Sequence, residues 1–317
     1  MKTKQLLLNN LKPLRIITEG LRLLKKPAMC LTAVRLKTLP AGLAPVITGL
    51  AVAAVYTQLN MAAAVFTFIS TAALQISANL INDYLDFVKG HDTGKRLGPK
   101  RVVQSGLMNA FEIQFLTALF LAAAVLSGAY LVMKAGICIF IIGLLSLTAA
   151  AGYSLFTKPM GFLGGGESSA FFFFGPVAVS GTFFIQTGFF SLELLFAGIS
   201  VGLYSLALLT VNNYRDIDED RLTGKITIPA RFGRPAAAAG YSGVLTAPFV
   251  GPLFMVISAG FHPVFLLPML SLIPGIVIFK RFIYSKPDRK LNRLLFFTSI
   301  TMIIHSLMYA AASVFYI

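Results

Sequence analysis

Carboxylate and amide side chains recur with the same spacing at two places in the sequence. Asn82 and Asp86 form the first cluster, and Asn212, Asp216 and Asp220 form the second. Side chains four residues apart lie on one face of an α-helix. Like charges on one face repel each other unless a cation neutralises them, and Mg²⁺ binds one or two carboxylates together with substrate phosphates. The two clusters therefore predict two Mg²⁺ ions that bridge one diphosphate.

Neighbouring side chains of the same types extend both clusters. Asn79 and Asp83 share the predicted helix face of the first cluster, and Asp92 is expected to enter from the loop that follows. Asp218 and Glu219 point away from the face of the second cluster and are expected to lie in solvent. Either cluster alone could be a solvated helix end, but the repeated spacing favours a site. The predicted metal ligands are Asn82, Asp83, Asp86, Asp92, Asn212, Asp216 and Asp220.

Basic side chains flank both clusters. Fixed positive charge around a departing diphosphate lowers the barrier to its loss. The same residues could instead mark the inner face of a membrane, because Lys and Arg gather in cytoplasmic loops, and both interpretations stay open. The predicted diphosphate- or substrate-binding residues are Asn79, Asn82, Lys100, Arg101, Asn212, Arg215 and Lys225.

The composition indicates a protein that is built for a lipid bilayer. Apolar residues make up 56% of the chain, charged residues 12%, and the mean hydropathy is +0.79. Soluble domains contain about 45–50% apolar and about 25% charged residues. The net charge is +15, and the basic residues that cause it cluster between long apolar runs. This distribution is typical of a membrane protein's topology and not of nucleic-acid binding. Cys30 and Cys138 are the only cysteines, and we expect both to be reduced packing residues.

Nine apolar stretches are long enough to cross a bilayer, which takes about 20 residues each. If the chain threads through them from an inner N-terminus, 26 of the 27 Lys and Arg residues fall on one side, and only Lys134 falls on the other. We therefore predict an all-α membrane protein of nine transmembrane helices, with both clusters on the inner side. The stretches are residues 39–57, 61–81, 111–133, 135–157, 168–186, 192–212, 236–257, 263–279 and 294–316.

Residues 1–34 are expected to form a basic segment that precedes a single transmembrane domain of residues 35–317. The leucines and isoleucine at 14–24 recur at helical spacing between basic residues, which is typical of a helix on an anionic membrane surface. A solvated tail is the alternative. The apolar run at 6–8 is too short for a signal peptide.

Four predicted spans separate the two clusters, which suggests a duplicated four-helix unit.

At these residues the chain resembles the UbiA-type intramembrane prenyltransferases, whose two motifs have the form Asn-x-x-x-Asp-x-x-x-Asp. The second cluster matches in full, whereas the first has Gly90 at its third position and Asp92 two residues later. This departure puts the role of Asp92 in doubt. The strings RLKTLPAGLAPVITG at 35–49, NDYLDFVKGHD at 82–92 and NNYRDIDEDRLTGK at 212–225 are similar to the branch that acts on 1,4-dihydroxy-2-naphthoate in menaquinone synthesis.

The resemblance runs from about residue 35 to 235. It implies a nine-helix bundle around a central cavity in the bacterial cytoplasmic membrane, with its active site facing the cytoplasm. It also implies Mg²⁺-dependent transfer of a polyprenyl group from polyprenyl diphosphate to the naphthoate, with loss of CO₂ and diphosphate. Asp86 and Asp216 would act at the reacting diphosphate.

The resemblance adds further site residues near the inner ends of the spans. Tyr153 and Lys158 resemble a Tyr and a Lys that the family places near the diphosphate and the reacting carbon. An interfacial Tyr with a snorkelling Lys is the alternative. Arg35 and Lys37 could attract an acceptor carboxylate, although topology charge explains them equally well. Glu167 is an acceptor-side candidate.

Two other classes of function remain to be separated from this one. A sister enzyme could use 4-hydroxybenzoate, homogentisate or a chlorin as its acceptor. A secondary transporter would place ionisable residues near the middle of broken helices, whereas the predicted spans carry no acidic or basic residue near their midpoints. His305 is the polar exception deep in a span, and we expect it to be packed and hydrogen-bonded.

Overall fold

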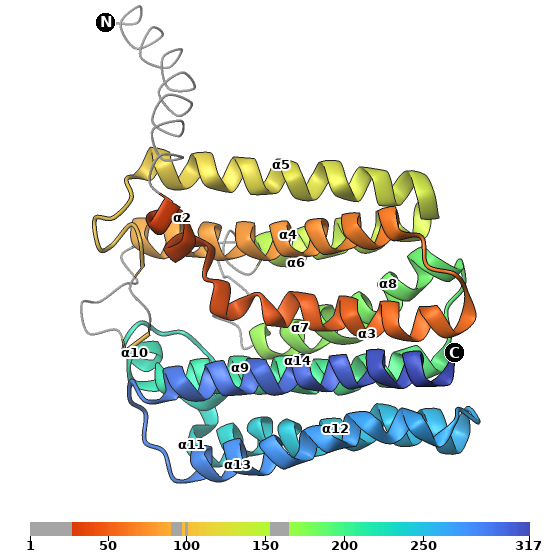
Figure 1. The fold of residues 1–317 in the computed structure, drawn as a ribbon. Helices are drawn as coiled ribbons and strands as arrows, with labels where there is room; N and C mark the ends of the chain where they lie inside the picture. Colours follow the sequence, from red (N-terminus) through yellow and green to blue (C-terminus); the bar gives the residue numbers. More distant parts are fainter. Residues whose placement is uncertain (1–26, 90–96, 99–100, 153–164) are drawn as a thin grey trace, which may run out of the picture.

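The computed structural model describes residues 27–89, 97–98, 101–152 and 165–317, and the regular elements of these residues are all helical. In Figure 1 the long helices lie side by side as one bundle. The amphipathic pattern predicted at 14–24 lies outside the described residues. The chain that is described confirms the predicted all-α class.

Helices occupy all nine predicted spans. Seven stretches of the described chain are long and apolar enough to cross a membrane, and two shorter apolar helices fill the remaining spans. The spans made of one helix each are α3 (Pro40–Tyr56), α4 (Met61–Val88), α5 (Ala110–Ala135), α6 (Ile137–Gly152), α9 (Leu192–Arg215) and α14 (Leu291–Tyr316). This arrangement is compatible with the predicted count of nine.

The other three spans are each built from consecutive helical elements. They are α7 (Gly166–Phe172) with η3 (Phe173–Val177) and α8 (Ala178–Thr187); α11 (Ile228–Tyr241) with α12 (Gly243–Leu253) and η4 (Phe254–Ser258); and η5 (Pro263–Ser271) with α13 (Leu272–Ile283). Pro176 lies within η3 and Pro268 within η5. Because proline lacks a backbone N–H and clashes with the preceding turn, it changes the helix type at these places.

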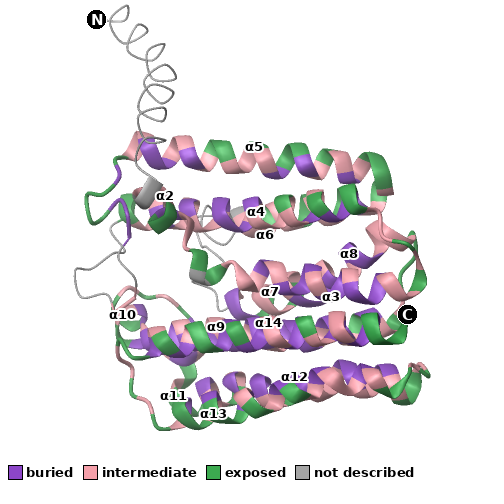
Figure 2. Cartoon of the chain, viewed as in Figure 1, coloured by how far each residue is buried: buried purple, intermediate pink, exposed green. Residues whose placement is uncertain are grey.

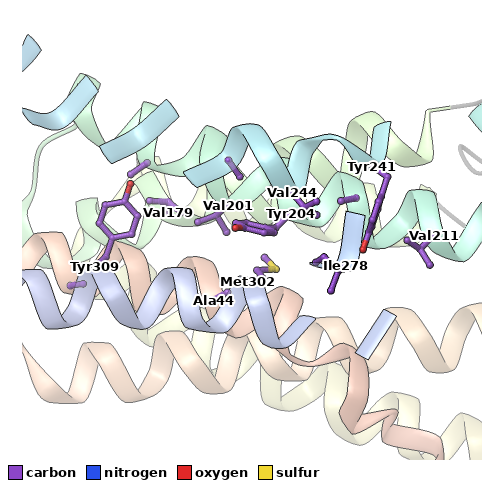
Figure 3. Close-up of a cluster of buried hydrophobic side chains, with 14 of the residues drawn as sticks. Ala44, Val179, Val201, Tyr204, Val211, Tyr241, Val244, Ile278, Met302 and Tyr309 are labelled. Atoms are coloured by element: carbon purple, nitrogen blue, oxygen red, sulfur yellow. The ribbon is translucent and has the colours of Figure 1, made fainter. Parts of the chain in front are cut away.

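α9 is the most buried of the long helices and forms the centre of the bundle. The largest core cluster includes Val201, Tyr204 and Val211 of α9 together with Val244 of α12 and Met302 of α14 (Figure 3). Figure 2 shows exposed residues along α5 at the edge of the bundle, as expected for a helix surface that faces lipid.

The centre of the bundle is packed so closely that glycine is required in α9. A Cβ atom on Gly198 would lie 2.6 Å from Cα of Pro176. Small residues of this kind let transmembrane helices approach backbone to backbone. His305 of α14 is fully buried, and its Nδ1 lies 3.0 Å from Oγ of Ser271. The expectation of a packed, hydrogen-bonded histidine is therefore confirmed.

The helices that carry the two clusters end at the same end of the bundle. α4 and α9 both run toward the end at which the short helices α2 (Pro27–Val34) and α10 (Ile217–Leu222) lie (Figure 1). α5 begins near that end with a capping box, in which Asn109 accepts from the N–H of Glu112 and Glu112 accepts from the N–H of Asn109. α4 continues to Val88, so the first cluster is helical, as predicted.

Candidate active site

Both clusters line one cavity. Its volume is ≈ 1310 Å³, and its wall includes Asn82 and Asp86 of α4 as well as Asn212, Asp216 and Asp220 from the end of α9 and from α10. The clusters are far apart in the sequence, but the parallel courses of α4 and α9 bring them to the same chamber. The structure thus places together the two groups of oxygen donors that the spacing predicted.

The cavity changes from apolar to polar along its length. On α4 the lining residues run from Thr67 through Leu74 to Asp86, and on α9 they run from Ser205 through Leu208 to Arg215. The opposite wall consists largely of apolar side chains from α5, α6 and α8. A chamber with this gradient suits an amphipathic ligand that has an anionic head and a long apolar chain.

The first cluster is paired with an arginine from the following loop. Nη2 of Arg101 lies 2.5 Å from Oδ2 of Asp86, and Nη1 of Arg101 donates to the backbone oxygen of Asn82 at 3.2 Å. The Arg101 side chain is buried, so this ion pair is shielded from solvent and the carboxylate stays in one orientation. Arg101 also lines the cavity.

Asp83 is turned into the wall of the cavity instead of lining it. Its Oδ2 accepts from the backbone N–H of Val102 at 3.2 Å, and its Oδ1 lies 3.7 Å from Nε of Arg101 and 3.8 Å from Nη2 of Arg35. This buried carboxylate fixes two arginines and the returning loop. Its expected place among the metal ligands is not supported by this position. Asn79 does line the cavity, and its Nδ2 donates to Oγ1 of Thr38 at 3.3 Å.

The second cluster lies on a bend and not on one continuous helix. α9 ends at Arg215, Asp216 has φ −97° and ψ 14°, and α10 begins at Ile217. Glu219 is half-buried and forms part of the cavity wall, so it is less exposed than a residue that lies fully in solvent. Asp218 is exposed, as predicted.

Arg215 is buried at the centre of the second cluster. Its Nε and Nη2 donate to the two carboxylate oxygens of Asp216 at 2.8 and 2.5 Å, and Nη2 also donates to Oδ1 of Asn212 at 2.9 Å. Its Nη1 donates to Oδ1 of Asn292 at 2.7 Å. The side chain of Arg215 is 0% exposed. Because a buried charge is costly unless it is paired and hydrogen-bonded, this set of partners explains how the arginine is tolerated.

Asp220 lies in the wall of the cavity beside a second cation. Its Oδ2 accepts from Oγ1 of Thr227 at 3.1 Å, and its Oδ1 lies 3.8 Å from Nζ of Lys225. Burial raises the pKa of the Asp220 carboxyl to about 6, although Lys225 and Thr227 act in the opposite direction. The ionised form of this carboxyl is therefore less stabilised than that of a surface aspartate in water.

The donor set fits a magnesium ion that arrives with a phosphate ligand. Among the described residues no three His, Cys, Asp or Glu side chains converge as a ready-made metal site. The cavity instead offers carboxylate and amide oxygens from two sides. Mg²⁺ keeps several waters and usually takes one or two carboxylates plus substrate phosphates. A site in which the protein supplies only some of the oxygen ligands is therefore suitable for Mg²⁺.

Glu167 braces three elements behind the second cluster. It is buried at the start of α7, and its Oε1 accepts from Nδ2 of Asn213 at 2.8 Å and from the backbone N–H of Ile228 at 2.9 Å. The carboxylate thus ties α7 to α9 and to the first turn of α11. This position in the wall favours a structural role over contact with an acceptor.

The remaining predicted residues divide into those that line the cavity and those that are not described. Arg35 and Lys225 line the cavity. Residues Asp92, Lys100, Tyr153 and Lys158, and the side chain of Lys37, lie outside the described part of the structure. Asn292, in the first turn of α14, also lines the cavity, and the sequence reasoning missed it. A single asparagine in a basic loop carries no spacing signal that could have revealed it.

The fold is similar to solved UbiA structures. A UbiA homolog from Aeropyrum pernix K1 matches with a TM-score of 0.65 and 20% identity, covering 86% of this chain and 97% of that chain. A UbiA homolog from Archaeoglobus fulgidus, solved bound to GPP and Mg²⁺, matches with a TM-score of 0.62 and 15% identity, covering 90% of this chain and 99% of that chain.

Sequence comparisons agree with the fold. The chain is 37% identical to a 1,4-dihydroxy-2-naphthoate octaprenyltransferase of Haemophilus influenzae over 207 residues, which are 63% of this chain and 67% of the relative. It is 35% identical to the Escherichia coli protein of the same name, over 64% of this chain and 68% of the relative. The model of the UbiA prenyltransferase family matches residues 42–306. The chain therefore belongs to the UbiA prenyltransferase family and is a membrane-spanning prenyltransferase.

Proposed function

We propose that this protein transfers a polyprenyl group from a polyprenyl diphosphate to 1,4-dihydroxy-2-naphthoate, as in menaquinone biosynthesis. The proposal rests mainly on one observation: residues of both clusters and many apolar side chains line the same cavity, whose volume is ≈ 1310 Å³. The choice of acceptor is supported by the bacterial relatives, which are named for the naphthoate and share 37% and 35% identity with this chain.

The polar end of the cavity would hold Mg²⁺ and the diphosphate. Structures of Archaeoglobus fulgidus UbiA homologs bound to GPP or DMAPP with Mg²⁺ support this pairing of metal and substrate. Bound Mg²⁺ would neutralise charge on the departing diphosphate oxygen. Each cluster would hold one ion, and the two ions together would hold one diphosphate. The ligands that we propose from this chain are Asn82, Asp86, Asn212, Asp216 and Asp220.

The chain's own side chains would orient the reactants and exclude water. The apolar walls from α5, α6 and α8 would enclose the polyprenyl tail, while Arg101 and Lys225 would supply positive charge near the diphosphate. The allylic C–O bond then breaks with its electron pair on the diphosphate, and a ring carbon of the naphthoate bonds to the allylic carbon. Loss of CO₂ accompanies the return of the ring to aromaticity.

Arg35 is the residue that we propose for the acceptor carboxylate. It lines the cavity and is the only described non-glycine residue with a positive φ, at 53°. A left-handed conformation is unfavourable for a side chain with a Cβ atom and persists where the surroundings enforce it. Here Thr38 donates to the Arg35 carbonyl at 2.9 Å, and Gln75 donates to the Thr38 carbonyl at 2.6 Å.

The polar mouth of the cavity is proposed to face the cytoplasm of a bacterial inner membrane. The threading that places 26 of 27 Lys and Arg residues on one side supports this orientation. Residues 1–34 would then form a basic segment at the membrane surface, and residues 35–317 would form one catalytic domain.

A panel of acceptors tests the proposal. Purified protein in detergent is incubated with Mg²⁺, labelled geranylgeranyl diphosphate and either 1,4-dihydroxy-2-naphthoate, 4-hydroxybenzoate or homogentisate. We expect a prenylated, decarboxylated product from the naphthoate and none after chelation of the metal. Product from 4-hydroxybenzoate or homogentisate without product from the naphthoate would overturn the choice of acceptor.

A further inference from the structure

Asn292 connects the ninth span to both clusters. It lies in the first turn of α14, at the end of the bundle where α10 also lies (Figure 1). Its Oδ1 accepts from Nη1 of Arg215 at 2.7 Å, and its Nδ2 donates to the backbone oxygen of Leu97 at 3.0 Å. Leu97 belongs to the loop that leads from the first cluster to Arg101. One amide thus joins the arginine of the second cluster to the loop of the first.

The two partners fix the orientation of the amide. A guanidinium has only donors and a carbonyl has only acceptor capacity, so the Asn292 oxygen must face Arg215 and its nitrogen must face Leu97. An amide carries its acceptor and its donor on two separate atoms, so it can reach both partners at once. Aspartate would keep the acceptor and lose the donor, and leucine would keep the shape and lose both.

Arg215 has little freedom once Asn292 is in place. Its hydrogen bonds use four of the five N–H donors that a guanidinium carries: two to Asp216, one to Asn212 and one to Asn292. Because the guanidinium group is planar and rigid, the position of Asn292 influences where the oxygen atoms of Asn212 and Asp216 lie. Arg215 acts in this arrangement mainly to position those oxygens, with at most one N–H left for a ligand in the cavity.

We propose that Asn292 is a positioning residue that sets the separation and orientation of the two clusters at the diphosphate end of the cavity. The inference rests on the proposed function, because it assigns Asn292 a role toward the Mg²⁺–diphosphate group. Two ions that share one diphosphate need donor faces at a fixed spacing, and a misplacement of about 1 Å is costly in such sites. Asn292 contributes to this spacing without being assigned as a metal ligand.

The test compares three variants of the full-length protein in detergent. N292L removes both hydrogen bonds, and N292D removes the donor to Leu97 and adds a carboxylate that competes with Asp216 for Arg215. T301V is the matched control, because Thr301 lies on the same helix and its hydroxyl donates only to the backbone oxygen of Phe297, at 2.9 Å. Binding of inorganic diphosphate in the presence of Mg²⁺ is measured by calorimetry, and thermal unfolding is followed by circular dichroism.

We expect N292L and N292D to weaken the binding of Mg²⁺–diphosphate by about tenfold or more, because the donor groups of the two clusters would be displaced from each other. The KM for farnesyl diphosphate and the Mg²⁺ concentration for half-maximal rate should rise with it. The KM for the naphthoate should stay within about twofold of the wild-type value, because the acceptor contacts are not touched. T301V should behave as the wild type in all of these measurements.

Separate outcomes identify which claim fails. If the wild type binds Mg²⁺–diphosphate and forms product while N292L and N292D match T301V, the positioning role of Asn292 is overturned and the proposed function stands. A rise in the naphthoate KM equal to the rise in the farnesyl diphosphate KM would also overturn it, because general loosening of the fold would then be sufficient. If N292L does not fold, N292D alone decides. If the wild type neither binds nor reacts, both proposals fall.

Discussion

Arginine side chains hold the reactive carboxylates of both clusters. Asp86 pairs with Arg101 and Asp216 pairs with Arg215, each with a contact of 2.5 Å. The two arginines come from different parts of the chain, one from the loop after α4 and the other from the last residue of α9. Each pair holds an acidic side chain in one orientation in a poorly solvated place. The carboxylates of Asp86 and Asp216, which we propose as metal ligands, are thus held in fixed orientations.

Glu167 makes a first prediction at the scale of single residues. Replacing it with alanine leaves the buried amide of Asn213 and the half-buried N–H of Ile228 without their acceptor, which should lower the free energy of unfolding by about 2 kcal/mol. E167Q keeps one carbonyl oxygen and should lose much less. Thermal unfolding in detergent measures both variants, and an E167A protein as stable as the wild type would show that the brace contributes nothing.

The limits of sequence reasoning are clear at the same scale. Helical spacing identified Asn82, Asp86, Asn212 and Asp216 because these residues follow a period that a helix imposes. The same spacing placed Asp83 on the ligand face, but a loop residue, Val102, binds it from the other side. No periodic pattern reveals where a loop returns, and for that reason Asn292 was also missed.

At the scale of elements, close packing of α9 against η3 holds the second cluster in place. Gly198 approaches the backbone at Pro176 so closely that a methyl group would lie 2.6 Å from its Cα. The spans themselves were predictable from hydropathy and charge, since lipid requires long apolar helices. The bend at Asp216 was not predictable, because the residues on both sides of it are compatible with a continuing helix.

A pair of glycine variants tests this packing. G198A should lower the free energy of unfolding by about 1–3 kcal/mol, as overpacking of a dense core does, and the transition should move to lower temperature. G143A is the matched control, since no atom lies within 4 Å of the position that its Cβ would take. Equal thermal stability of the two variants would contradict the packing of α9 on η3.

At the scale of the whole molecule, the basic residues mark one face of the bundle. The predicted threading leaves Lys134 alone on the face opposite the clusters, whereas Lys286 lies with them in the loop before α14. Both lysines are exposed. The same distribution would attract an anionic substrate to the mouth of the cavity. The same basic residues would therefore both orient the protein in the membrane and attract the substrate.

Single-cysteine labelling tests the orientation. In a cysteine-free background, Lys134→Cys should react with a membrane-impermeant thiol reagent added outside intact bacterial cells. Lys286→Cys should react only after the membrane is opened, because the predicted threading places it on the cytoplasmic side. The reverse pattern would contradict the proposed cytoplasmic mouth.

The central claim is that the two clusters together hold Mg²⁺ and a diphosphate at the mouth of one cavity. The most direct measurement is prenyl transfer and Mg²⁺-dependent diphosphate binding by D86N, D216N and the double variant, each compared with the wild type at equal helix content by circular dichroism. We predict that each single change lowers the rate by about a hundredfold or more, since charge stabilisation at the departing group is lost, and that diphosphate binding weakens in parallel. Wild-type binding and transfer by either folded variant would contradict the account.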